Sequence, residues 1–161
     1  MPSIRAPCFD PVVFQARAWV PSWLPVILWM LLIFSGSTDL LSTERTSRII
    51  APLLRWLKPD LSEAAIKNVQ FILRKCGHVT EFAVLAVLFW RALRPAVVAS
   101  WNWMHARNAL VFAALYAVSD EVHQYFVASR MASGWDVLID IVGAAAGLFV
   151  LWRFGRSRQY W

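Results

Sequence analysis

Long apolar runs separated by short polar connections dominate the pattern of this 161-residue chain. Four of them are long enough to cross a membrane as helices, which takes about 20 residues. They extend over residues 18–36, 69–90, 108–127 and 134–152. Arginine and lysine gather between the runs, as is typical of loops at a membrane surface. The pattern predicts an all-α fold, an integral membrane bundle of four transmembrane helices.

The polar connection between the first two runs contains a shorter helical pattern. Apolar residues recur there with helical spacing, at Ile49, Ile50, Leu53, Leu54 and Leu57. Basic residues occupy the opposite face, so the pattern predicts one short interfacial amphipathic helix on the membrane surface. A helix packed as a lid over the bundle is the alternative, and neither interpretation adds a spanning segment.

The flanks of the runs divide the chain into three parts. Residues 1–17 are expected to form an N-terminal lead, residues 18–153 one membrane domain and residues 154–161 a basic C-terminal tail. Small residues follow the first run, as they do in a cleaved signal peptide. We expect a retained helix instead, because its removal would leave only three spans.

Composition indicates that lipid is the solvent. The chain is 59% hydrophobic and 16% charged, whereas a soluble domain has about 25% charged residues. The net charge of +6 does not indicate a nucleic-acid partner, because no helix carries a sustained basic face. The two cysteines do not make a disulfide framework, and the oligomeric state is left open.

Ionisable and amide side chains interrupt the runs at one end of three of them. They are Lys75, His78 and Glu81 in the second run, Asp120, Glu121, His123 and Gln124 in the third, Arg130 in the following turn, and Asp136 and Asp140 in the fourth. In an up-down bundle these ends meet at one membrane face. A charge facing lipid costs roughly 2.5–3.5 kcal/mol near the bilayer centre, so we expect a single polar site. A slight bias of basic residues predicts that both termini are cytoplasmic and that the site lies on the outer face.

Four motifs occur in a fixed order along the chain. They are Arg74-Lys75-Cys-Gly-His78-Val-Thr-Glu81-Phe82, Ser119-Asp-Glu-Val-His123-Gln124, Arg130, and Asp136-x3-Asp140-x2-Gly143. This ordered set resembles the VanZ-like membrane proteins, a family named after a protein associated with teicoplanin resistance. The resemblance implies a multi-pass protein of the bacterial cytoplasmic membrane. It also implies a relation to membrane enzymes that act on lipid head groups, with which VanZ-like domains have been grouped on comparative grounds.

The residue types favour chemistry on a lipid phosphate, either a phospholipid or a polyprenyl-linked phosphate. A carboxylate can orient an imidazole as a general base or nucleophile. The expected catalytic residues are therefore His78, His123, Glu81, Asp120 and Glu121. Arginine and lysine suit a phosphate, and we expect Arg130 to face Asp136 or Asp140 and to hold a phosphate with Lys75. The expected substrate-binding residues are Lys75, Gln124, Arg130, Asp136 and Asp140.

Other functions use the same residues. A metal site is disfavoured because the histidine spacing differs from that of a His-Glu-x-x-His zinc helix, and we expect neither a metal nor a cofactor. Intramembrane Asp and His chains also serve proton-coupled transporters. A protein that binds lipid or glycopeptide without catalysis, or a polar network that only locks the bundle, are the remaining alternatives.

Overall fold

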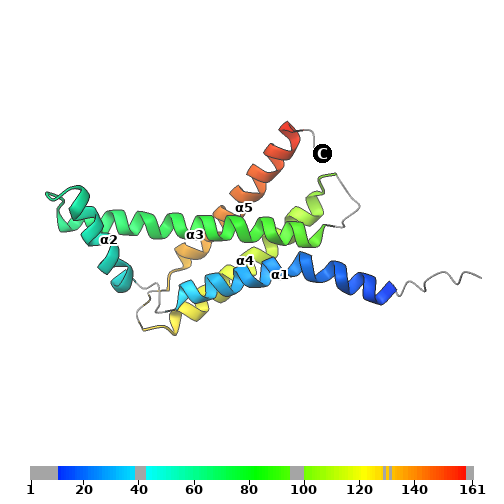
Figure 1. The fold of residues 1–161 in the computed structure, drawn as a ribbon, viewed down its shortest axis with the longest axis horizontal. Coiled ribbons are helices and arrows are strands. Elements are labelled where there is room, and N and C mark those ends of the chain that lie inside the picture. Colours follow the sequence, from blue (N-terminus) through cyan, green and yellow to red (C-terminus); the bar gives the residue numbers. More distant parts are fainter. Residues whose placement is uncertain (1–10, 39–42, 95–99, 129, 131, 159–161) are drawn as a thin grey trace, which may run out of the picture.

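The computed structural model describes residues 11–38, 43–94, 100–128, 130 and 132–158, which form five helices and no strand (Figure 1). The helices are α1 (Pro11–Ser37), α2 (Thr43–Leu57), α3 (Glu63–Leu93), α4 (Trp103–Tyr125) and α5 (Gly134–Ser157). Each predicted span coincides with one of the four long helices, and the predicted surface helix with α2. The predicted fold class is therefore confirmed.

Capping side chains explain where two of the helices begin. The Ser62 hydroxyl accepts a hydrogen bond of 3.2 Å from the Ala65 amide, so α3 begins at Glu63, earlier than the predicted start at residue 69. The Asn102 side chain accepts a bond of 2.8 Å from the Met104 amide at the start of α4. Each cap satisfies an amide that lacks a partner within its helix.

Helix α1 differs from the prediction at its N-terminal end. It begins at Pro11, so residues 11–17 of the predicted lead are helical, and residues 1–10 lie outside the described part. Pro21 and Pro25 are therefore inside the helix. Pro25 has no N–H to donate to the Pro21 carbonyl, and Arg91 of α3 donates to that carbonyl at 3.0 Å. An arginine thus replaces the missing helical bond.

The C-terminal end also differs from the expected boundary. Helix α5 continues to Ser157, so the predicted tail is helical over residues 154–157. Residues 159–161 lie outside the described part.

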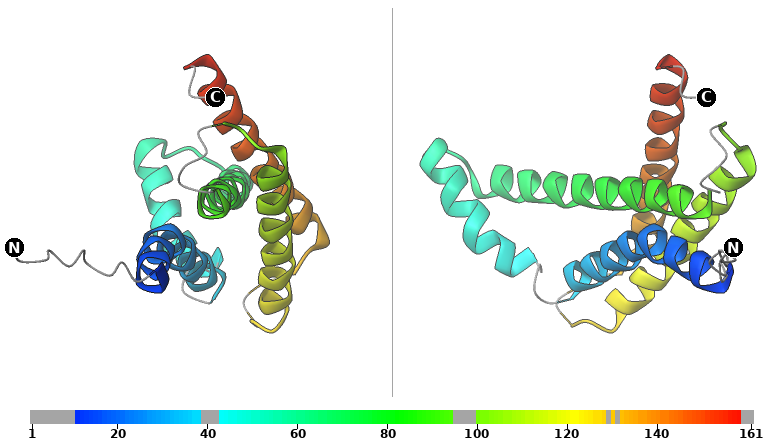
Figure 2. Two further views of the ribbon diagram at one scale, coloured as in Figure 1. Left: turned by 90° about the vertical axis from the view of Figure 1, so that its right-hand side faces the viewer. Right: turned by 45° about the vertical axis from the view of Figure 1, so that its right-hand side comes forward.

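The long helices cross in two antiparallel pairs. Helices α1 and α3 run in opposite directions beside one another, and α4 and α5 form a second pair that crosses them obliquely (Figures 1 and 2). The ends of α1 and α4 and the beginning of α5 lie toward the side of the molecule that carries α2 (Figure 1). The arrangement brings these helix ends together, as up-down threading predicts.

Two glycines allow α5 to lie directly against α3. A Cβ atom added at Gly143 would lie 2.5 Å from the Val79 carbonyl oxygen, and one at Gly147 would lie 2.5 Å from that of Ala83. Only residues without side chains permit such an approach, which is the role of small-residue pairs in membrane helices. The contact therefore fixes where α5 crosses α3.

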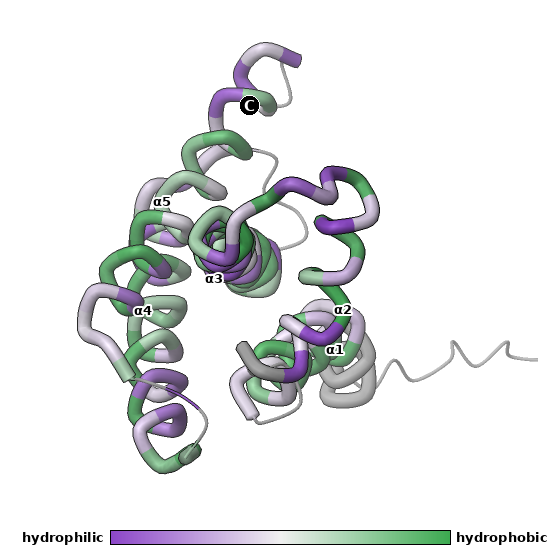
Figure 3. Tube along the Cα trace, turned by 90° about the vertical axis from the view of Figure 1, so that its left-hand side faces the viewer, coloured by the Kyte–Doolittle hydropathy of each residue, from purple (hydrophilic) through white to green (hydrophobic). Residues whose placement is uncertain are grey.

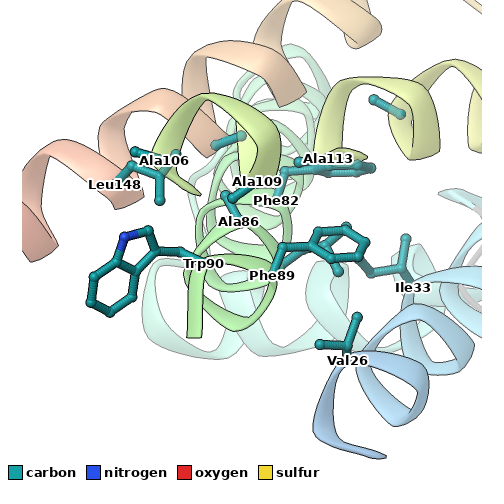
Figure 4. Packing of buried hydrophobic residues seen from close by; sticks show 13 residues of the cluster. Val26, Ile33, Phe82, Ala86, Phe89, Trp90, Ala106, Ala109, Ala113 and Leu148 are labelled. Carbon is teal, nitrogen blue, oxygen red and sulfur yellow. The ribbon is translucent and has the colours of Figure 1, made fainter. Parts of the chain in front are cut away.

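The hydrophobic core forms where α3 faces α1, α4 and α5. Phe82 and Leu85 of α3 are fully buried, and α4 meets them with small side chains, including Ala109 and Ala113. Leu148 of α5 joins the same cluster; Figure 4 shows its place beside the α3 and α4 side chains. Because α4 presents alanines, the helices come close together in the core.

In the described part of the chain, three helical segments are long and apolar enough to cross a membrane, namely Trp19–Ser37, Glu63–Leu93 and Gly134–Ser157. Helix α4, with 23 residues, is about 34 Å long and also of spanning length. It is less apolar because Asp120, Glu121, His123 and Gln124 are near its end. Figure 3 shows hydrophilic residues in this part of α4 and along α3, among otherwise apolar turns.

Helix α2 has an apolar face that the other described residues leave uncovered. Ile49 is 73% exposed and Trp56 is 77% exposed. Thr46 and Ile50, on another side of the helix, line a cavity against α3. Helix α2 therefore covers the cavity with one side and exposes apolar side chains on another. It combines features of the predicted lid and of the predicted surface helix.

Candidate functional site

An open cavity of about 210 Å³ lies where the polar helix ends meet. All four helices α1 to α4 and the turn before α5 contribute to its wall. The lining residues with polar side chains are Ser37, Thr46, Gln70, Arg74, His78, Glu81, Gln124 and Arg130. Four of the predicted site residues, His78, Glu81, Gln124 and Arg130, therefore share one cavity.

Behind the cavity, two polar pairs join α3 to α5. The Lys75 ammonium donates to Oδ1 of Asp136, and Nδ1 of His78 lies 3.1 Å from Oδ1 of Asp140. Asp136 and Asp140 are 3% and 1% exposed. Along α3 and α5 the partners follow in the same order, so the two helices run in the same direction where they touch. The structure therefore brings Lys75, His78, Asp136 and Asp140 together, as the up-down threading predicts.

The contact with Asp140 determines how His78 can act. An ionised carboxylate only accepts hydrogen bonds, so beside ionised Asp140 a neutral His78 imidazole would carry its proton on Nδ1 and donate it to that carboxylate. The ring is then held in one tautomer, with Nε2 left as an acceptor. Since His78 also lines the cavity, this acceptor is available to a ligand there.

The end of α4 supplies a second polar group beside the cavity. The Gln124 amide donates to Asp120 Oδ2 at 3.0 Å and to the Ser37 hydroxyl at 3.4 Å. The Glu121 carboxylate accepts a hydrogen bond from the Ser133 amide just before α5. Asp120 and Glu121 are buried and lie outside the cavity lining. The Gln124 contact joins the end of α4 to α1, and the Glu121 contact joins it to the start of α5.

Arg130 lies at the cavity with contacts other than those predicted. Its Nε and Nη2 atoms donate to the Thr38 carbonyl at 3.3 and 3.1 Å, and Nη2 also donates to the Gly36 carbonyl. These carbonyls are at the C-terminal end of α1, where helical carbonyls lack partners and a positive charge is stabilised. The predicted contact with Asp136 or Asp140 is thus corrected, because those carboxylates bind Lys75 and His78.

Lys75 and His123 also lie differently from the prediction. Lys75 faces Asp136 and is absent from the cavity lining, so it does not oppose Arg130 across the cavity. The His123 ring packs against Phe34 of α1, with ring centroids 4.4 Å apart. It is outside the cavity lining as well. Of the two histidines predicted to be catalytic, His78 alone lies at the cavity.

Arg74 is a cavity residue that the sequence-based selection omitted. At about 100° per residue, Arg74, His78 and Glu81 fall on one stripe of α3, while Lys75 points about 100° away from Arg74. Helical spacing from His78 and Glu81 would therefore have selected Arg74 for the cavity. Its Nη2 atom lies 3.9 Å from Asp136, so it is close to the α3–α5 pairs as well.

Within the described ranges, no three His, Cys, Asp or Glu side chains converge as possible metal ligands. The acidic residues instead bind a lysine, a histidine, an amide side chain and a backbone amide. The arrangement is suited to hydrogen bonding and proton exchange.

Comparison with known protein families gives a match over most of the chain. A family model described as VanZ/LLP1 matches residues 22–155, which include α3, α4, most of α1 and α5, and every predicted site residue. The chain belongs to the VanZ-like family. No curated protein and no solved structure matches it.

Family membership explains the surface of this VanZ-like protein. Its long helices expose many large apolar side chains, among them Leu28, Leu115 and Val142. A soluble protein rarely exposes so many large apolar side chains. In a membrane, lipid covers them. The family and the apolar helices together show a membrane protein.

Proposed function

We propose that this VanZ-like protein binds the phosphate of a lipid head group in the cavity and that His78 acts on the bound lipid as a base. The observation that carries the proposal is the position of His78, which lies between Asp140 and a cavity lined by two arginines. The expected substrate class is a phospholipid or a polyprenyl-linked phosphate.

The charges of the cavity support an anionic ligand. Among the described lining residues, Arg74 and Arg130 contribute two positive charges and Glu81 contributes one negative charge. Arginine presents planar, forked donors that match a phosphate. Asp140 binds His78, and Asp136 binds Lys75 at shorter range than its 3.9 Å contact with Arg74, so most of this excess remains. The positive charge of the cavity lining therefore favours a phosphate as the ligand.

The position of α2 supports a lipid rather than a soluble phosphate. Its exposed apolar residues, Ile49, Leu53, Trp56 and Leu57, suit insertion into the head-group region. Thr46 and Ile50 of the same helix line the cavity. A helix that lies at the interface thus holds the cavity at the depth of the lipid phosphates. Following the charge bias of the loops, we assign this depth to the outer leaflet of a bacterial cytoplasmic membrane.

The His78–Asp140 pair supports acid–base chemistry. In the proposed step a hydroxyl oxygen attacks the phosphorus atom, and its proton passes to Nε2 of His78. The bond from phosphorus to the leaving oxygen breaks, and the imidazolium returns the proton to that oxygen. Asp140 stabilises the imidazolium through the Nδ1–H bond, as a buried carboxylate does in other acid–base pairs.

A non-catalytic lipid-binding protein is the second candidate. The pairs Lys75–Asp136 and His78–Asp140 connect α3 to α5 close to the glycine contact. Such a network can specify the packing of helices without chemistry. In this case the cavity would bind the head group, and the lipid would leave unchanged.

Mass spectrometry of lipid that copurifies with the protein tests the proposal. We expect wild-type protein to retain a phosphate-bearing lipid and Arg74→Gln to lose most of it. Arg48→Gln is the matched control, because Arg48 is an exposed arginine of α2 outside the cavity lining. Equal retention by both variants would contradict a phosphate site in this cavity. A bound lipid that wild type converts and His78→Gln retains unchanged would separate catalysis from binding alone.

A further inference from the structure

A second cavity of about 450 Å³ continues from the first beneath α2. Its lining includes Ser47 and Ala51 of α2 and a row of α3 residues from Glu63 to Arg74. Gln70 and Arg74 line both cavities. The two spaces therefore adjoin along the same face of α3.

One polar stripe of α3 forms the floor of both cavities. At about 100° per residue, Lys67, Gln70, Arg74, His78 and Glu81 fall within an arc of about 80°. Lys67 lies two turns before Arg74, an axial distance of about 10.5 Å. Positive charges thus follow the stripe beyond the site cavity.

The charge of the second cavity is also positive. Its acidic residue, Glu63, pairs with Arg55 of α2. In the described part of the chain no carboxylate pairs with Lys67, which is exposed at the cavity. Arg74 lines this cavity, and its guanidinium also lies 3.9 Å from Asp136 in the first turn of α5. A second anionic group could therefore bind Lys67 and Arg74 without breaking a short ion pair of either residue.

A neutral hydrogen bond lies at the boundary between the two cavities. The Gln70 amide donates to the Ser47 hydroxyl at 3.0 Å, joining α3 to α2. A neutral bond of this kind adds little net stability, so breaking it costs little when both groups gain new partners. A ligand that extends from one cavity into the other can therefore replace it with bonds of its own.

We propose that the head group bound here carries two phosphate groups, one in the site cavity and one in the second cavity with Lys67 and Arg74. This inference rests on the proposed function and adds the class of lipid. The two phosphates can be linked directly, as in a polyprenyl diphosphate, or through a glycerol, as in cardiolipin. A single-phosphate lipid would leave Lys67 without a ligand.

Binding of paired probes to the purified protein in nanodiscs tests this class. Farnesyl diphosphate is compared with farnesyl monophosphate, and cardiolipin with phosphatidylglycerol, for wild type, Lys67→Gln and Lys58→Gln. Lys58 is an exposed lysine outside both cavities and is the matched control. We expect wild type to prefer a two-phosphate probe by about tenfold, the effect of one additional charged hydrogen bond. Lys67→Gln should remove this preference, and Lys58→Gln should keep it.

The outcomes separate the two proposals. The pair of probes that shows the preference identifies the direct or the glycerol linkage. Equal affinity of wild type for one-phosphate and two-phosphate probes would overturn the two-phosphate inference and leave the proposed function standing. A preference that Lys67→Gln retains in full would also overturn it. Failure of wild type to bind any of the four probes saturably would overturn the proposed function itself.

Discussion

The imidazole of His78 and the carboxylate of Asp140 meet across the α3–α5 interface, with Nδ1 and Oδ1 3.1 Å apart. Asp140 is 1% exposed and His78 is 8% exposed. The partner of His78 is thus a residue of another helix, far along the chain, and not the acidic residue three positions away on its own helix. The pair connects the packing of α3 and α5 to the cavity.

This pair should show energetic coupling. We expect His78→Ala and Asp140→Ala each to lower the free energy of unfolding in detergent by about 1–3 kcal/mol, because each leaves a buried polar group without its partner. The double variant should lose less than the sum, by about 1 kcal/mol or more. His105→Ala provides a control outside the site. Strictly additive losses would show that the two side chains do not interact.

Gly143 should not tolerate a side chain. A methyl group there would meet the Val79 carbonyl oxygen at 2.5 Å, so α5 must move away from α3. We expect Gly143→Ala to lower the free energy of unfolding by about 1–3 kcal/mol, the usual cost of overpacking. Gly134→Ala is the matched control, because no atom lies within 4 Å of a Cβ added there. Similar stability of the two variants would contradict the described helix contact.

Arg130 should hold the C-terminal end of α1. Lysine would keep the positive charge but lose the forked donors that bind the Gly36 and Thr38 carbonyls. Arg130→Lys should therefore speed amide hydrogen exchange at residues 34–38 by about tenfold, equivalent to the loss of one net hydrogen bond. Arg48→Lys should leave this exchange unchanged. If Arg130→Lys also left it unchanged, Arg130 would not secure α1.

Four spans place the connection after α2 and the C-terminus on opposite sides of the membrane. Reporter fusions after Lys58 and after Arg158 should accordingly give opposite signals, with Arg158 on the cytoplasmic side. The result also tests α4, whose polar end makes it less apolar than the other long helices. Signals on the same side would remove α4 or another helix from the spanning set.

The hydrophobic pattern was sufficient to predict the helices, because each long helix must satisfy its backbone hydrogen bonds and cover an apolar face in lipid. The predicted start of the first span at residue 18 was too late, because Pro21 and Pro25 suit a first helical turn better than a helix interior. In the folded protein Arg91 donates to the Pro21 carbonyl that Pro25 leaves free. That compensation comes from another helix, and a local pattern does not reveal it.

The site was predicted in part for a similar reason. Up-down threading was enough to bring Lys75, His78, Asp136 and Asp140 to the same end of the bundle. Which cation met which carboxylate depended on the close approach at Gly143, which sets the rotation of α5 against α3. Arg130 turned to the end of α1 because unpaired carbonyls lie there, and its position in a turn gave no indication of that partner.

Nitrogen NMR of the protein labelled at histidine tests the central claim most directly. The chain has three histidines. The pair of ring-nitrogen signals that is lost in His78→Gln belongs to His78. On addition of farnesyl monophosphate in nanodiscs, we expect the Nε2 signal of His78 to shift saturably, while Nδ1 stays hydrogen-bonded to Asp140 and His105 stays unchanged. Saturable binding of the probe with no change at His78 would contradict the account.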